Sequence, residues 1–167
     1  KVGDALTQGT DIGPVVSQAQ LEQDLSYVEI ARAEGATLAA GGARVACHTG
    51  SGHDGFFMAP ALITDTTAGM RINREEVFGP VAVLLRAHDE AHAVELANDN
   101  PFGLGASIYS ADAAQAWHYA EQLQTGAVFI NRHTSSDLRL PFGGVKASGY
   151  GRELSEFGLY EFVNVKS

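Results

Sequence analysis

The sequence contains a single cysteine, Cys47, among its 167 residues. A lone cysteine excludes an internal disulfide bond, and this composition fits the reducing environment of the cytoplasm. We therefore expect a cytoplasmic location.

Long apolar runs are also absent. No stretch approaches the ~20 apolar residues of a membrane-spanning helix, and no charged segment followed by an apolar one at the N-terminus resembles a secretory signal. The chain begins at Lys1 rather than Met, which suggests a processed or cut chain. Its apolar content of 45% is ordinary for a globular protein, and its length suffices for one domain with a core.

Basic residues are scarce. The chain has 11 Lys and Arg against 20 Asp and Glu, which gives a net charge of −9. Nucleic-acid phosphates bind basic surfaces, so this balance argues against a nucleic-acid partner. The acidic excess identifies no other partner, because a solvated acidic surface explains it.

Glycine, in contrast, is concentrated in the stretch 140–157. Four glycines fall within nine residues there, namely Gly143, Gly144, Gly149 and Gly151. Flexible Gly/Ser linkers carry few aromatic residues, yet this stretch includes Phe142, Tyr150 and Phe157. We therefore predict an ordered, tightly packed loop rather than a linker.

The spacing of these glycines excludes two phosphate-binding motifs. A P-loop requires contiguous Gly-Lys-Ser/Thr, but Val145 separates Gly144 from Lys146 and Ala147 separates Lys146 from Ser148. A dinucleotide-binding fingerprint has different glycine spacing and follows directly on a strand. The residues alone thus indicate a constrained loop and no specific ligand.

Hydrophobic periodicity predicts an α/β protein. We expect helices at 17–32, 65–74, 89–98, 112–122 and 152–158, and strands at 37–40, 56–64, 81–86, 106–109, 127–131 and 161–166. Ser17 is a fair N-cap for the first helix, Gly35 its stop, and Trp117 is expected to face the core. The alternation of strand and helix over 81–131 predicts a parallel sheet.

The predicted strand 127–131 leads into a long loop that extends to Lys146. Loops beyond ~12 residues are usually functional, and open α/β sheets bind ligands at the carboxyl ends of parallel strands. This loop is therefore a candidate binding region. The last predicted strand, 161–166, alternates like an edge strand and needs a partner, which a neighbouring subunit could provide.

Two sets of residues invite a metal-site interpretation. Cys47, His48 and His53 lie in a Gly-rich segment, but no second Cys or His cluster completes a site, and a variable surface turn explains them.

His88 and His92 have the spacing of the zinc motif HExxH. Asp89, however, occupies the position of the motif's glutamate, and Glu90 comes one residue too late. A solvated helix start explains this pair, and we expect no metal.

The strings PFGGVKASGYGREL (141–154) and EEVFGPV (75–81) resemble two signatures of the aldehyde dehydrogenase superfamily, and the resemblance covers residues 3–166. It implies an α/β fold, the C-terminal part of that family's catalytic domain, with a parallel-sheet core and helices on both faces. Residues 1–160 would be catalytic domain, and 161–167 would begin an oligomerisation strand. The dinucleotide-binding domain would be absent from this chain.

The resemblance also implies cofactor-binding residues. Glu76, the second glutamate of EEVFGP, would hydrogen-bond the nicotinamide ribose of NAD or NADP, because a carboxylate accepts from two vicinal hydroxyls. Phe78 would pack near the nicotinamide. Without the resemblance, a helix-end carboxylate and a core aromatic would explain both residues.

Phe142 of PFGG would line a substrate tunnel. The preceding segment 131–141 is polar, and residues 131–167 resemble succinate-semialdehyde dehydrogenases, in which a serine at the position of Ser136 helps to bind the substrate carboxylate. Arg139 could add a cationic partner if it points inward. The alternative is a solvated surface pair of Arg139 with Asp137.

The resemblance implies NAD(P)-dependent oxidation of an aldehyde to a carboxylic acid, most closely of succinate semialdehyde. The family's nucleophilic cysteine and general-base glutamate would precede Lys1, and Cys47 lies too close to EEVFGP to be that cysteine. We therefore expect this chain to be inactive alone. A homo-oligomer, dimer or tetramer, is expected. The alternatives are a non-catalytic assembly module, or a dehydrogenase for another aldehyde.

Overall fold

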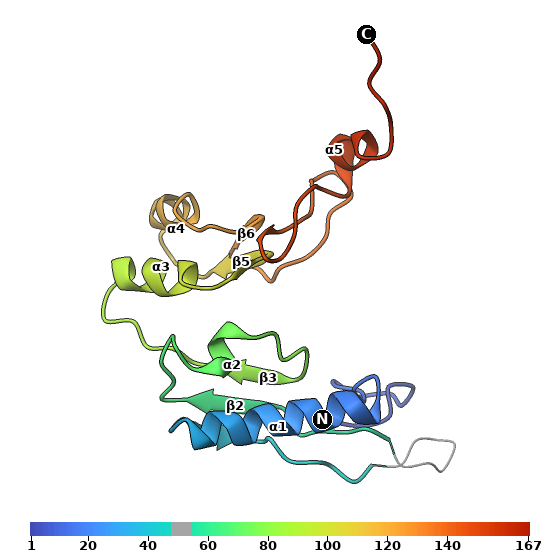
Figure 1. Ribbon diagram of the computed structural model, residues 1–167, viewed down its shortest axis with the longest axis vertical. Helices are drawn as coiled ribbons and strands as arrows, with labels where there is room; N and C mark the ends of the chain where they lie inside the picture. The colour runs from blue at the N-terminus through green and yellow to red at the C-terminus, as the bar shows by residue number, and fades with distance from the viewer. Residues whose placement is uncertain (48–54) are drawn as a thin grey trace. The chain divides into compact units, whose positions relative to one another are not determined.

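The structure is a computed structural model that describes residues 1–47 and 55–167. The chain forms two compact units, Lys1–Arg86 and Ala87–Ser167, and each is described by itself (Figure 1). His48 and His53, two members of the first metal hypothesis, lie outside the described residues.

The first unit contains one long helix and a small mixed sheet. Its elements are α1 (Gln18–Ala33), β1 (Thr37–Ala40), β2 (Ala61–Thr64), α2 (Arg71–Arg74) and β3 (Val81–Val83). The sheet order is β1-β2-β3, with β1 antiparallel and β3 parallel to β2. The predicted cap of α1 is confirmed, since Ser17 Oγ accepts from the Gln20 backbone N–H at 3.1 Å. Gly35 adopts a φ of 100°, which favours glycine, and ends the helix as predicted.

The core of this unit lies between α1 and the sheet. Two clusters of buried side chains join helix and strands: Leu21, Val28, Met58 and Ala61 form one, and Ala31, Ala36, Ile63 and Ile72 form the other. Each large apolar side chain buried in this way contributes about 1.5–3 kcal/mol. The core therefore holds α1 in place beside the segment that follows α2.

The second unit contains three helices and two pairs of short strands. Its elements are α3 (Glu90–Asn98), β4 (Phe102–Gly103), β5 (Gly105–Ile108), α4 (Ala113–Ala120), β6 (Ala127–Ile130), β7 (Val145–Lys146) and α5 (Ser155–Tyr160). β5 and β6 are parallel, as expected for a strand–helix–strand unit, whereas β4 and β7 are antiparallel. Asp89 and Asp112 cap α3 and α4 by accepting backbone N–H groups of His92 and Gln115.

The predicted α/β fold class is confirmed, but the predicted arrangement of the strands is wrong. The chain has an α/β fold, but its strands form three small sheets, one mixed, one antiparallel and one parallel, rather than one parallel core. Periodicity indicates where a strand lies and not which strand it pairs with, so the antiparallel pairings were missed. The strand expected at 56–64 begins only at Ala61, directly after Pro60, which lacks the N–H needed for a ladder.

The C-terminal strand predicted at 161–166 is absent from the chain. α5 ends at Tyr160, and the N–H groups of Phe162 and Val163 donate to Leu159 and Tyr160 in turns. A strand requires a second strand for its hydrogen bonds, and no described segment pairs with this one.

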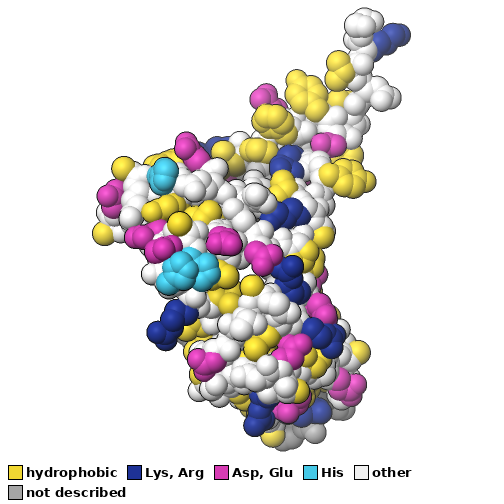
Figure 2. All heavy atoms as spheres, turned by 60° about the vertical axis from the view of Figure 1, so that its left-hand side comes forward, with side chains coloured by type: hydrophobic (Ala, Val, Ile, Leu, Met, Phe, Trp, Pro, Cys, Tyr) yellow, Lys and Arg dark blue, Asp and Glu magenta, His cyan; other side chains and the backbone are white. Residues whose placement is uncertain are grey.

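The second unit leaves much apolar surface exposed. Among the apolar side chains of residues 87–167, all described, Ala116 alone is classed as buried. Trp117, expected in the core, is 65% exposed. Figure 2 shows hydrophobic side chains exposed on the C-terminal segment. Tyr150, Phe162 and Val165 are among the exposed apolar residues of this unit. Patches of this kind usually mark contact surfaces.

Candidate functional site

The segment 75–79, here called the EEVFG loop, joins α2 to β3 in the first unit. Phe78 has a φ of 61°, which is rare for a bulky residue and occurs mostly where function or packing imposes it. Its side chain is 75% exposed, so the alternative of a core aromatic is wrong. The loop thus presents an aromatic ring to solvent at a strained position.

Glu75 anchors the start of this loop. Arg71 donates to both of its carboxylate oxygens, at 2.7 and 2.8 Å, and the Tyr27 hydroxyl donates at 2.7 Å. The Arg71 guanidinium also lies 5.8 Å from the centre of the Tyr27 ring. The hydrogen bonds from Arg71 and then from Tyr27 lower the pKa of Glu75 to about 2. Glu75 is therefore ionised and held at any physiological pH.

Glu76, in contrast, is exposed and forms no hydrogen bond with another described residue. The two adjacent carboxylates thus differ: Glu75 is bound to α1 and α2, and Glu76 remains available to a ligand. The helix-end role considered for Glu76 belongs to Glu75, which is the C-cap of α2. A carboxylate with both oxygens unused can accept from two hydroxyls.

Two glutamines of α1 hold the middle of the loop. Gln20 Nε2 and Gln23 Nε2 donate to the Val77 carbonyl at 3.1 and 3.0 Å. Sequence reasoning missed both residues, because they precede Val77 by 57 and 54 positions. The only indication in the sequence was their i, i+3 spacing, which places both side chains on one face of a helix.

The EEVFG loop borders a shallow depression of about 470 Å³. Its lining consists of Ile72, Glu75, Glu76, Val77, Phe78, Gly79 and Val81. One free carboxylate and one exposed aromatic ring on its rim are the groups that a sugar hydroxyl pair and a flat heterocycle require. The depression therefore offers groups suited to a ligand that combines paired hydroxyls with a flat ring.

The second candidate region starts at Asn131 in the other unit. Its side chain accepts from Ser110 N–H and donates to Ser110 O, both at 2.9 Å. These bonds tie the carboxyl ends of the parallel strands β5 and β6 together, and Asn131 has a φ of 54°. The loop that follows thus leaves from a fixed point at the carboxyl end of a parallel strand, and its ligand-binding role stays a prediction.

Arg139 and Asp137 form the surface pair considered as the alternative. Arg139 Nε and Nη2 donate to Asp137 at 2.9 and 2.7 Å, and the Arg139 side chain is 86% exposed. These hydrogen bonds hold the pKa of Asp137 far below its usual range. Ser136, one residue earlier, is exposed on the same loop.

Phe142 lies half-buried at the end of this loop. It exchanges two backbone hydrogen bonds with Glu153, both 2.8 Å, and borders a depression of about 420 Å³ together with Leu104, Gly144 and Arg152. The structure thus groups Ser136, Arg139 and Phe142 along one loop of the second unit, and Glu76 and Phe78 on one loop of the first.

The glycine-rich stretch is an ordered loop, as predicted. Arg152 Nη1 donates to the carbonyls of Gly144 and Gly151, at 3.0 and 2.6 Å. Ser148 Oγ accepts from the Gly103 N–H at 2.9 Å, and Lys146 Nζ donates to two carbonyls at the end of α3. The polar residues of this signature therefore bind backbone groups rather than pointing to a ligand.

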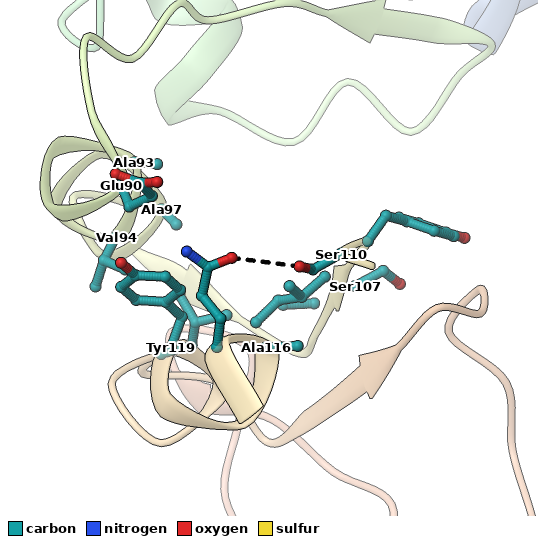
Figure 3. Close-up of a pocket in the computed structure, with 13 residues that line it drawn as sticks. Glu90, Ala93, Val94, Ala97, Ser107, Ser110, Ala116 and Tyr119 are labelled. Atoms are coloured by element: carbon teal, nitrogen blue, oxygen red, sulfur yellow. Dashed lines mark hydrogen bonds between the residues drawn. The ribbon is translucent and has the colours of Figure 1, made fainter. Parts of the chain in front are cut away.

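A separate apolar pocket lies between α3 and α4 over β5 (Figure 3). Its volume is about 400 Å³, and its walls include Val94, Ala97, Ala116 and Tyr119. Polar residues also line it, among them Glu90, Ser107, Ser110 and Gln115, and Ser110 Oγ donates a hydrogen bond to Gln115 Oε1 at 3.4 Å. None of the residues predicted to bind cofactor or substrate lines it.

The described residues contain no cluster of three potential metal ligands. His88 and His92 instead stack with ring centres 3.9 Å apart at the start of α3. Within 1–47 and 55–167, no helix is long and apolar enough to cross a membrane.

A model of the aldehyde dehydrogenase family matches residues 1–167. The chain belongs to the aldehyde dehydrogenase family. It is 46% identical over 164 residues to the succinate-semialdehyde dehydrogenase (NADP+) of Deinococcus radiodurans, covering 98% of this chain and 33% of that protein. It is 43% identical over 166 residues to a chloroplastic aminoaldehyde dehydrogenase of Arabidopsis thaliana, covering 99% and 32%.

A crystal structure of another aldehyde dehydrogenase supports this family assignment. Betaine aldehyde dehydrogenase from Staphylococcus aureus, in complex with NAD+, matches with a TM-score of 0.91 and 40% identity, over 97% of this chain and 32% of that one. The chain thus spans about one third of the length of these aldehyde dehydrogenases.

Proposed function

We propose that this chain is the C-terminal part of an NAD(P)-dependent aldehyde dehydrogenase and that it supplies the binding site for the nicotinamide ribose. The observation that carries the proposal is the contrast between the anchored Glu75 and the free Glu76 on the EEVFG loop. Family membership supports it, as does the NAD+ complex of the S. aureus relative.

The reaction is the oxidation of an aldehyde by NAD(P)+ and water, which yields a carboxylic acid, NAD(P)H and a proton. The bound cofactor accepts the hydride. In this family a cysteine thiolate attacks the aldehyde carbon, and a general base activates the water that hydrolyses the thioester left after hydride transfer; we place both residues in the part of the protein that precedes Lys1. This chain's residues orient the cofactor: Glu76 accepts from the ribose hydroxyls, and Phe78 packs beside the nicotinamide.

Succinate semialdehyde is our first candidate substrate. On one loop, Ser136 offers a hydroxyl group, Arg139 a cation and Phe142 an apolar wall. The D. radiodurans relative is a succinate-semialdehyde dehydrogenase. For Arg139 to bind the substrate carboxylate, it must leave Asp137. Ser136 can bind the carboxylate without such a change.

An aminoaldehyde is the second candidate. The loop carries Asp137 as well as Arg139, and the held-down pKa of Asp137 keeps it negative, which suits a cationic substrate. The A. thaliana relative is named for aminoaldehydes. The two candidates differ in the charge of the substrate's tail.

We also propose that the protein is a cytoplasmic homo-oligomer in which 161–167 pairs with a neighbouring subunit. The exposed Phe162 and Val165 support the pairing, as does the backbone of residues 164–167, which forms no hydrogen bond with another described residue. The alternative hypothesis is that the protein is a non-catalytic assembly module, which would bind no cofactor.

The test is NAD(P)H formation by the protein expressed from its complete gene, measured by absorbance with succinate semialdehyde and with an aminoaldehyde of similar length. We expect faster turnover with succinate semialdehyde. Preference for the aminoaldehyde would contradict succinate semialdehyde as the substrate but would support the proposed dehydrogenase activity. Failure to oxidise any aldehyde would favour the assembly module.

A further inference from the structure

Asp24 is a buried acidic residue in the middle of α1. Its side chain is 0% exposed. Oδ1 accepts from Gln20 Nε2 at 2.7 Å, but Oδ2 has no hydrogen-bond partner among the described residues. Burying a carboxyl group with an unused oxygen is costly. An apolar residue would fill this position at lower cost, so the carboxyl group calls for an explanation.

The carboxyl group lies directly against Gly79, the last residue of the EEVFG loop. A Cβ atom built on Gly79 would overlap all three atoms of the Asp24 carboxyl group. The backbone of the loop can therefore approach α1 this closely only with glycine at this position. Asp24 thus packs against the C-terminal end of the EEVFG loop.

Gln20 links Asp24 to the middle of the same loop. Its Nε2 atom donates to Asp24 Oδ1 at 2.7 Å and to the Val77 carbonyl at 3.1 Å. An amide nitrogen carries two hydrogens, and these bonds use both. By accepting one, Asp24 fixes the orientation of the amide group and directs the other hydrogen to Val77.

We propose that Asp24 is a positioning residue for cofactor binding: it holds the EEVFG loop, through Gln20 and by contact with Gly79, in the conformation that presents Glu76. The inference rests on the proposed function, in which Glu76 binds the nicotinamide ribose. Asp24 acts on the cofactor only through the loop.

The surroundings of Asp24 determine the best variants. No charged side chain among the described residues forms an ion pair or hydrogen bond with it, and burial raises its pKa. Asn has nearly the same shape and keeps the acceptor for Gln20 without the charge. Ala removes the acceptor. Asp24→Asn should therefore preserve the loop, and Asp24→Ala should release Gln20.

The experiment measures the dissociation constants of NAD+ and NADP+ in the protein expressed from its complete gene, without aldehyde. We expect Asp24→Ala to weaken binding of the preferred cofactor about 3- to 10-fold, in line with loss of one hydrogen bond that positions the loop. Asp24→Asn should stay within about twofold of the original protein, since the acceptor is kept. The control Glu22→Ala removes an exposed acidic residue of the same helix, bonded only to Gln18, and should have no effect.

A general loss of folding would lower the number of binding sites and leave the dissociation constant of the remaining sites unchanged. Unchanged binding in Asp24→Ala would overturn the proposal. If Asp24→Ala does not fold, Gln20→Ala, which cuts the same link from a half-buried position, decides by the same criterion. Glu76→Gln separates the two claims: if it leaves cofactor binding intact, the proposed function fails; if it weakens binding while Asp24→Ala does not, only the role of Asp24 fails.

Discussion

Arg71 binds both carboxylate oxygens of Glu75 from one helical turn away, at 2.7 and 2.8 Å. Through this pair and the Tyr27 hydroxyl, the first glutamate of the EEVFG loop is fixed to the helices around it. The second glutamate, Glu76, is left exposed beside it. The loop therefore carries one anchored carboxylate and one exposed carboxylate side by side.

This division predicts that Glu75→Gln weakens cofactor binding although the Glu75 carboxylate is occupied by Arg71 and Tyr27. Loss of the ion pair with Arg71 should loosen the loop and lower kcat/KM for NAD(P)+ about 3- to 10-fold, because small misplacements of binding groups are costly. Arg71→Met should have a similar effect, and the double variant should be little worse than either single one, since the residues act as a pair. Additive losses in steady-state kinetics would show that the two residues act separately.

The buried Asp24 predicts how stability depends on pH. Its pKa is raised in the folded protein, so the folded state binds more protons than the unfolded state above about pH 4, and stability falls as pH rises through the raised pKa. Asp24→Asn lacks this titration. Its melting temperature should exceed that of the original protein at about pH 8 and match it near about pH 4. A constant difference across this range, measured by differential scanning fluorimetry, would contradict the raised pKa.

The substrate loop predicts a change of preference rather than a loss of activity. Arg139→Ala removes the cation and frees Asp137 from its partner. We expect kcat/KM for succinate semialdehyde to fall and kcat/KM for an aminoaldehyde to rise, each by about 3- to 10-fold, because exposed ion pairs are worth little and the tail charge is partly solvated. Ser136→Ala should lower only the first value. Equal effects on both substrates in competition assays would show that the loop does not select the tail.

The exposed surface of the second unit predicts that the isolated 167-residue chain is incompletely packed. With Ala116 alone among its apolar side chains classed as buried, residues 87–167 lack the core that the first unit has. The isolated chain should bind the dye ANS strongly, aggregate at micromolar concentration, and form no NAD(P)H. Weak dye binding and a cooperative melt would show that the segment folds alone.

Local features of the fold could be predicted from the sequence. Ser17 and Gly35 bound α1 as expected because capping depends on a few neighbouring residues. The strand predicted at 161–166 did not form, because strands need partners that periodicity does not identify. The prediction that Trp117 faces the core was wrong for a related reason. The apolar face of a helix does not show which surface will cover it.

The candidate site was partly predictable. The resemblance indicated the EEVFG loop and singled out Glu76 rather than Glu75, and the structure supplies a physical basis for that choice in the hydrogen bonds of Glu75. Gln20 and Asp24 could not be predicted, since their contacts with Val77 and Gly79 join segments more than 50 residues apart. The ligand-binding roles of Glu76, Phe78, Ser136, Arg139 and Phe142 all remain predictions.

The most direct test of the central claim is kcat/KM for NAD(P)+ in Glu76→Gln, measured in the protein expressed from its complete gene, with Glu22→Gln as the control on an exposed acidic residue. Glutamine keeps the size of the side chain but accepts through one oxygen and carries no charge. If Glu76 binds the ribose hydroxyls, kcat/KM should fall about 10- to 100-fold, the value of a hydrogen bond to a charged group. A value equal to that of the control would contradict the account.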